Sequence, residues 1–90
     1  MSQMILFNGI TAEEHKEYVQ KNRNINHINQ LIEHRQEGIE KIENICNVNG
    51  WKTMHTGGTF LFNYQGNDAE IAREIFNIIS YHRIIPVPQL

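Results

Sequence analysis

The stretch "MHTGGTFLFNY", residues 54–64, decides the fold because it is typical of two strands joined by a glycine turn. Gly57 and Gly58 supply the positive φ angles that tight hairpin turns require. With both glycines in the turn, the strands pair outward as far as Trp51 opposite Tyr64, and directly paired residues share a face. One face then carries Trp51, Thr53, His55, Phe60, Phe62 and Tyr64, and the other carries Lys52, Met54, Leu61 and Asn63. Because the aromatic side chains gather on one side, the pattern predicts a β-hairpin with one buried face.

Three interpretations of the aromatic strand compete. Alternating Phe60, Phe62 and Tyr64 suit the stacking of nucleic-acid bases, but the basic residue that usually accompanies such a strand is missing. A phosphate cradle at the glycines is disfavoured, because they precede a strand and no Lys-Ser/Thr pair follows them. A two-stranded hairpin must bury one face to be stable. We therefore expect these aromatics, together with Trp51 and His55, to lie in the core.

Capping signals predict two shorter helices. Thr11 and Glu14 have the spacing of a capping box, which predicts a helix from about Ala12 to Gln20 or Lys21. Asn67 is the expected N-cap of a second helix over about 68–83, which has a wide apolar face.

Short apolar runs at the two ends of the chain predict extended segments. "MILF", residues 4–7, is followed by a turn signal and predicts a strand. "IIPV", residues 84–87, contains a proline that forbids helix and favours an edge strand. We expect it to pair either with the first strand or with another chain.

The longest periodic segment runs from about residue 24 to residue 47 and predicts one long helix. Its apolar positions alternate in steps of three and four, which is the seven-residue repeat of packed helices. This helix seam consists of Ile25, Ile28, Ile32, Arg35, Ile39, Ile42 and Cys46. A helix of about 22 residues spans ~33 Å, which is longer than the hairpin covers. We therefore expect part of the seam to pair with the same helix of another subunit.

Arg35 and Gly38 interrupt the pattern of the long helix. Two interpretations of Arg35 stay open: its guanidinium snorkels to the edge of the packed face, or it reaches a carboxylate of a partner helix or a small anionic ligand. A glycine inside a helix costs about 1 kcal/mol relative to alanine, so Gly38 indicates a kink or a close backbone approach. An antiparallel crossing of two subunits near Gly38 fits both features.

Together these signals predict a single α+β domain over residues 1–90. Its small antiparallel sheet is centred on the hairpin at about 51–64. One long helix covers about 24–47, with an N-terminal helix before it and a C-terminal helix at about 68–83.

Charge, cysteine count and apolar content limit the binding partners and the compartment expected for this chain. The chain has 90 residues and a formal net charge of −2, with no basic block of the kind that binds nucleic acid or anionic lipid. Cys46 is the single cysteine, so an internal disulfide is impossible and a reducing compartment is expected. No stretch approaches the roughly 20 apolar residues of a membrane span, and the first residues make a poor signal peptide. We expect a cytoplasmic protein.

The spacing of reactive residues argues against catalysis and metal binding. Among the five histidines, His27 and His34 are two helical turns apart, ~10 Å, which is too far to share an ion. No zinc-site spacing occurs, and no paired acid–base or nucleophile arrangement is present. Cys46 fits a small core residue. We predict no catalytic residue, no metal and no cofactor.

Two functions remain. The first is a small non-enzymatic interaction or regulatory protein that oligomerises through the long helix. The interface residues expected for it are Ile25, Ile28, Ile32, Arg35, Gly38, Ile39 and Ile42. The chain contains 14 Ile and 11 Asn, residues favoured by AT-rich codons, which suggests a phage or bacterial inhibitor of a host or defence-system protein. The alternative is a nucleic-acid-binding regulator that uses the aromatic hairpin and the Asn/Lys/Arg-rich segment 21–30.

Overall fold

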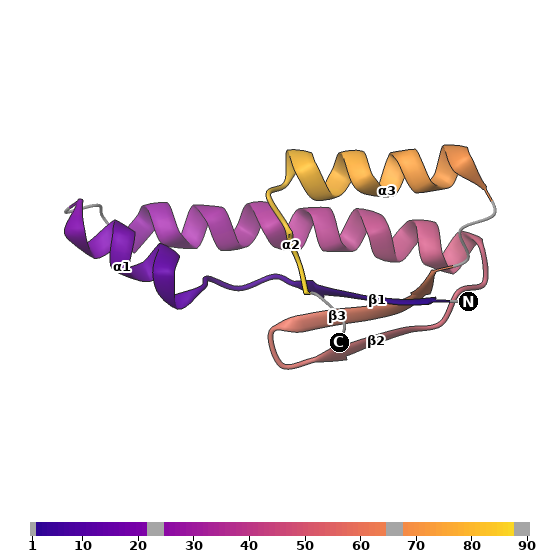
Figure 1. Ribbon diagram of the computed structural model, residues 1–90, viewed down its shortest axis with the longest axis horizontal. Coiled ribbons are helices and arrows are strands. Elements are labelled where there is room, and N and C mark those ends of the chain that lie inside the picture. Colours follow the sequence, from indigo (N-terminus) through magenta and orange to yellow (C-terminus); the bar gives the residue numbers. More distant parts are fainter. Residues whose placement is uncertain (1, 22–24, 65–67, 88–90) are drawn as a thin grey trace.

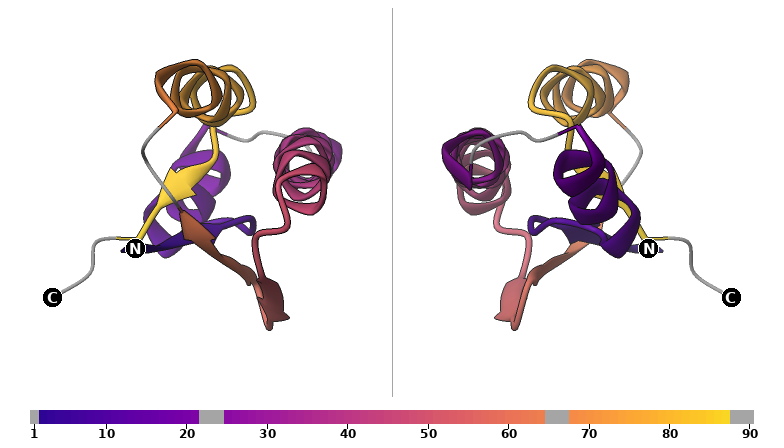
Figure 2. Two further views of the ribbon diagram at one scale, coloured as in Figure 1. Left: turned by 90° about the vertical axis from the view of Figure 1, so that its right-hand side faces the viewer. Right: turned by 90° about the vertical axis from the view of Figure 1, so that its left-hand side faces the viewer.

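Three helices and a four-stranded antiparallel sheet make up the described part of the chain, which in the computed structural model is residues 2–21, 25–64 and 68–87. In chain order the elements are β1 (Ser2–Phe7), α1 (Ala12–Gln20), α2 (Ile25–Val48), β2 (Thr53–Thr56), β3 (Thr59–Tyr64), α3 (Ala69–Tyr81) and β4 (Ile85–Pro86). Helices α2 and α3 lie on one face of the sheet, and α1 lies next to the N-terminal half of α2 (Figures 1 and 2). The α+β class with one long helix is confirmed.

The hairpin has the predicted register. Thr53 pairs with Phe62, and Thr56 pairs with Thr59 next to the turn. Of the two glycines in the turn, Gly57 has a positive φ, 59°, whereas Gly58 does not. This fits a turn that needs the left-handed region only at its first central residue.

The sheet places the two ends of the chain beside the hairpin. The strand order is β2-β3-β1-β4, so β1 is a central strand between β3 and β4. Leu6 pairs with Pro86, and the amide of Val87 donates to the carbonyl of Ile5 at 2.8 Å. The expectation that "IIPV" pairs with the first strand is therefore confirmed, and β4 needs no second chain as its partner.

The helix ends follow from their capping residues. Thr11 and Glu14 form the predicted capping box of α1, and Gly50 follows α2 with a φ of 71°. The prediction of Asn67 as the N-cap of α3 is wrong. Asn67 lies outside the described residues, and the side chain of Asp68 caps the helix by accepting from the amides of Glu70 and Ile71.

The core lies between the sheet and the two helices α2 and α3. Phe60 and Phe62 are fully buried, and Trp51 is buried with its ring edge-on to Tyr64. The core cluster is Leu6, Ile39, Ile42, Cys46, Trp51, Phe60, Phe62, Ile75, Ile79 and Ile84. The prediction of His55 as a core residue is wrong: it is exposed and pairs with Glu43, because it lies on β2, an edge strand of the sheet.

Replacement of Phe62 tests which face of the hairpin is the core. Phe62→Ala removes a ring that is 1% exposed, so we expect the free energy of unfolding to fall by about 3–5 kcal/mol. Urea denaturation followed by circular dichroism measures this loss. The matched control is Asn63→Ala, the next residue on the opposite face, for which we expect a change within about 0.5 kcal/mol. Equal losses in the two variants would contradict the arrangement.

Candidate functional site

The helix seam is mostly covered by the chain itself. Ile39 and Ile42 belong to the core cluster, and Ile28 is buried. Ile32 is half-buried, and the side chain of Ile25 lies outside the described part of the structure. The physical reason is that α3 and the sheet together cover the C-terminal half of α2. This half of the seam therefore has an intrachain partner, and the expectation that another part of the seam pairs with a second subunit stays a prediction.

Gly38 marks a close approach within the chain and not between subunits. A Cβ at this position would lie 2.6 Å from the Cβ of His82 and 2.7 Å from the Cδ1 of Ile84. The end of α3 therefore occupies the space that a second helix would need. The predicted close backbone approach is confirmed, but its assignment to a crossing of two subunits is wrong.

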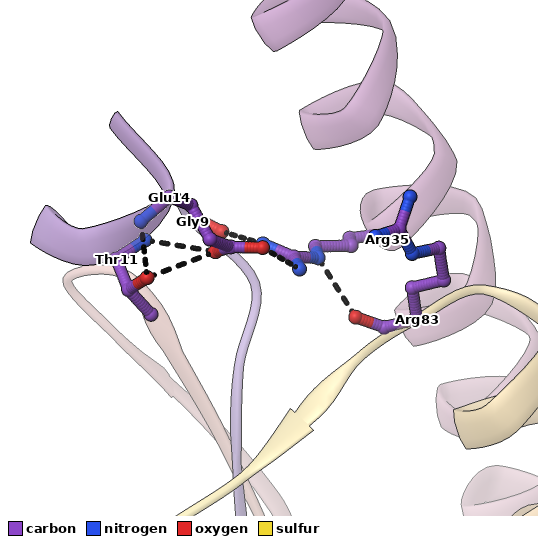
Figure 3. Close-up of polar contacts among 5 residues, drawn as sticks. All are labelled: Gly9, Thr11, Glu14, Arg35 and Arg83. Atoms are coloured by element: carbon purple, nitrogen blue, oxygen red, sulfur yellow. Dashed lines mark hydrogen bonds and ion pairs between the residues drawn. The ribbon is translucent and has the colours of Figure 1, made fainter. Parts of the chain in front are cut away.

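Arg35 is buried, and its guanidinium contacts three segments of the chain (Figure 3). Nε donates to the carbonyl of Arg83 at 2.8 Å, and Nη1 donates to the carbonyl of Gly9 at 2.6 Å. Nη1 and Nη2 donate to the two carboxylate oxygens of Glu14 at 3.0 and 2.6 Å. The snorkelling interpretation is therefore wrong. Arg35 does reach a carboxylate, but one of α1 in the same chain.

Glu14 is held in its charged form by this contact. The hydrogen bond from Arg35 is the main reason that the pKa of Glu14 falls from 4.5 to about 2, and burial opposes the shift. Thr11 adds hydrogen bonds from its amide and its hydroxyl to the same carboxylate. The capping box of α1 thus also positions the Glu14 carboxylate, which neutralises the charge of Arg35.

The opposite face of the sheet, here called the outer sheet face, is apolar and has no described helix over it (Figure 2). Strand pairing aligns Met54 with Leu61 and Leu61 with Ile5, and a hydrogen bond sets Val87 beside Ile5. The face is defined by Ile5, Phe7, Met54, Leu61, Ile85 and Val87. Met54 is 61% exposed and the other five are half-buried.

Sequence reasoning missed this surface because it is made by strands from both ends of the chain. The hairpin register placed Met54 and Leu61 on the face away from the aromatics, but two residues do not make a surface. The missing information was that β1 enters the sheet beside β3, which adds Ile5 and Phe7 to the same side.

The aromatic residues proposed for base stacking are not on a surface. Phe60, Phe62 and Trp51 are buried under α2 and α3, and Tyr64 packs against the Trp51 ring. Residues 22–24 of the segment 21–30 lie outside the described residues. The hairpin therefore does not present these buried rings to nucleic-acid bases, as the nucleic-acid hypothesis requires.

The fold gathers three potential metal ligands at one point and buries the single cysteine. His34, Glu37 and His82 come together from α2 and the end of α3, a contact across 45 or more residues that spacing within a helix does not reveal. Cys46 is fully buried, and burial raises the pKa of its thiol to about 11. Cys46 is thus a core residue without thiolate character, as predicted.

In the part of the chain that the structure describes, no helix combines the length and the apolar character that a membrane crossing requires. Comparison with known proteins finds no matching family model, no similar curated protein and no similar solved structure.

The ion pair predicts a pH dependence of stability. Because the pKa of Glu14 is about 2 in the folded chain and ordinarily 4.5, the unfolded chain binds more protons between these values. The stabilisation by the pair is complete above pH 4.5 and is lost as the pH falls toward 2. Glu14→Gln should remove this dependence and lower stability by about 3 kcal/mol at pH 7, since it leaves Arg35 buried without a counter-charge.

Urea denaturation between pH 2 and pH 7 measures both effects. The control is Glu17→Gln on the same helix, whose pair with Lys21 is exposed and contributes little. A Glu14→Gln variant with the same stability and the same pH profile as the unsubstituted chain would refute the role given to the pair.

Gly38→Ala tests the close approach against helix propensity. Propensity alone favours alanine by about 1 kcal/mol, but the new methyl group would overlap His82 and Ile84. We expect a net loss of about 1–3 kcal/mol from overpacking. Thermal unfolding shows whether Gly38→Ala lowers or raises the stability. Gln36→Ala, at an exposed position of α2, is the control. A gain in stability for Gly38→Ala would show that the end of α3 does not lie there.

Proposed function

We propose that the protein is a small non-enzymatic interaction protein that acts as a homodimer, with the outer sheet face as its interface. The observation that carries this proposal is the apolar row Met54–Leu61–Ile5–Val87, which runs across β2, β3 and β1 to the residue after β4, on the side of the sheet without a described helix. Apolar patches of this kind, with a polar surround, mark interaction sites. Assembly as an oligomer was expected from the sequence, and the proposal moves the interface from the helix seam to the sheet.

The chain exposes more surface than an average monomeric protein of its mass. The surface of the monomer is 6250 Å², whereas a monomeric protein of this mass is expected to expose about 5,500 Å². The excess is close to the roughly 800 Å² that each partner buries in a standard interface. A C2 dimer uses the same patch on both subunits, so one apolar face is sufficient.

The charges of the outer sheet face also favour a second copy. Lys52 is the one charged residue among the positions that the strand pairing assigns to this side of β1, β2 and β3, and it lies at the end of the hairpin beside Asn63. Two such faces meet without a cluster of like charges. Nucleic acid requires several cations facing its phosphates, and this surface does not offer them.

The dimer brings two sheets together. Sheets that pack face to face lie about 10 Å apart with interdigitating side chains, which suits the medium and large residues on this face. The helices then form the two outer layers of a four-layer assembly. The hypothesis of a phage or bacterial inhibitor of a host or defence-system protein stays a prediction, since no described feature bears on it.

Leu61→Lys tests the proposal, because it places a charge at the centre of the apolar row. We expect size exclusion with light scattering to give a dimer for the unsubstituted chain and a folded monomer for Leu61→Lys. Met54→Lys, at a more exposed position of the same row, should weaken the dimer and guards against a folding defect. Circular dichroism checks that each variant is folded.

Gln36→Lys on the exposed side of α2 is the control and should leave the dimer intact. A monomer at all concentrations of the unsubstituted chain would overturn the proposal. So would a dimer that survives in both Leu61→Lys and Met54→Lys.

A further inference from the structure

Three side chains that ligate metals meet where the end of α3 approaches the middle of α2. His34 and Glu37 are one turn apart on α2, and His82 is the C-cap of α3. One potential ligand atom from each lies within 4.8 Å of those of the other two. We infer that His34, Glu37 and His82 bind a single Zn²⁺ ion.

The hydrogen bonds of the two histidines orient them for this role. Nδ1 of His82 donates to the carbonyl of His34 at 2.6 Å, and Nε2 of His34 donates to the carbonyl of Tyr81 at 3.0 Å. A carbonyl oxygen only accepts, so the nitrogen facing it carries the hydrogen. Nε2 of His82 and Nδ1 of His34 keep their lone pairs. A histidine whose second nitrogen donates to a backbone carbonyl is the usual arrangement of zinc ligands.

The cluster is held on a rigid frame and is open on one side. His82 is 1% exposed and is seated against Gly38, and the two imidazole rings lie 4.4 Å apart. Glu37 is exposed and His34 half-buried, so an ion enters from the solvent. A groove of about 490 Å³, lined in part by Lys41, Tyr81 and His82, adjoins the cluster.

The donor set selects the metal. Two imidazoles and one carboxylate form a set that Zn²⁺ uses, with a fourth position left for water. At zinc–ligand distances of about 2.0–2.2 Å, tetrahedral ligands lie about 3.3–3.6 Å apart, so the exposed Glu37 and the half-buried His34 must move inward by small side-chain rotations. Harder ions such as Mg²⁺ and Ca²⁺ prefer oxygen ligands.

Lys41 is the competitor for the site. Its ammonium lies 3.1 Å from Nε2 of His82, where it donates to the lone pair that zinc needs. Zinc binding must displace this hydrogen bond and overcome the positive charge. Lys41→Met removes both obstacles and keeps the aliphatic stem, so it should tighten binding severalfold.

The experiment is a zinc titration of the chelator-treated full chain, by calorimetry and by the rise in melting temperature with ZnCl₂. We expect one ion per chain. Glu37→Gln and His34→Gln should each weaken binding tenfold or more, because each removes one of three ligands. Glu40→Gln, an exposed acid on the same helix, is the control and should bind as the unsubstituted chain does.

Addition of Co²⁺ supplies a readout that a change in stability alone does not give. Visible absorption bands of low-coordinate cobalt should appear with the unsubstituted chain and be lost in Glu37→Gln. Absence of zinc binding, or an affinity unchanged in both Glu37→Gln and His34→Gln, would overturn the inference. A Lys41→Met variant that binds zinc more weakly would also overturn it.

Discussion

The buried guanidinium of Arg35 ties together segments that are far apart in the sequence. A desolvated cation costs several kcal/mol unless its hydrogen bonds are satisfied and its charge is paired. Glu14 supplies the charge, and the carbonyls of Gly9 and Arg83 supply the remaining acceptors. These partners fix the start of α1, the turn before it and the turn after α3 against the middle of α2. The fold around α2 therefore depends on one arginine.

The turn after α3 shows how this constraint acts on the backbone. Arg83 has a φ of 57°, a left-handed conformation that costs a non-glycine residue of order 1–3 kcal/mol. In this conformation the chain leaves α3 and enters β4 while the carbonyl of Arg83 accepts from Arg35. The preceding residue, His82, packs on Gly38. A single segment is thus held at two neighbouring points of α2.

Elements that depend on short local motifs could be predicted from the sequence. The hairpin register, the capping box at Thr11 and the ends of α2 follow from turn chemistry and periodicity, and each is confirmed within one or two residues. The seven-residue repeat of α2 shows that one side of this helix is buried but does not show that α3 and the sheet cover Ile39 and Ile42. Arg35 and Gly38 were recognised as unusual residues. Their partners lie 21 to 48 residues away, at distances that no spacing rule covers.

The last strand connects the features of the molecule that carry its proposed activities. Neighbouring residues of this segment serve different parts of the molecule: His82 is a proposed zinc ligand, the carbonyl of Arg83 accepts from Arg35, Ile84 enters the core, and Ile85 and Val87 belong to the outer sheet face. A ligand that fixes His82 therefore acts on the same short segment, residues 82–87, that supplies two of the six residues of the proposed dimer interface. Since the proposed zinc ligands and the outer sheet face lie on opposite sides of the sheet, both can be occupied at once, and residues 82–87 link them directly.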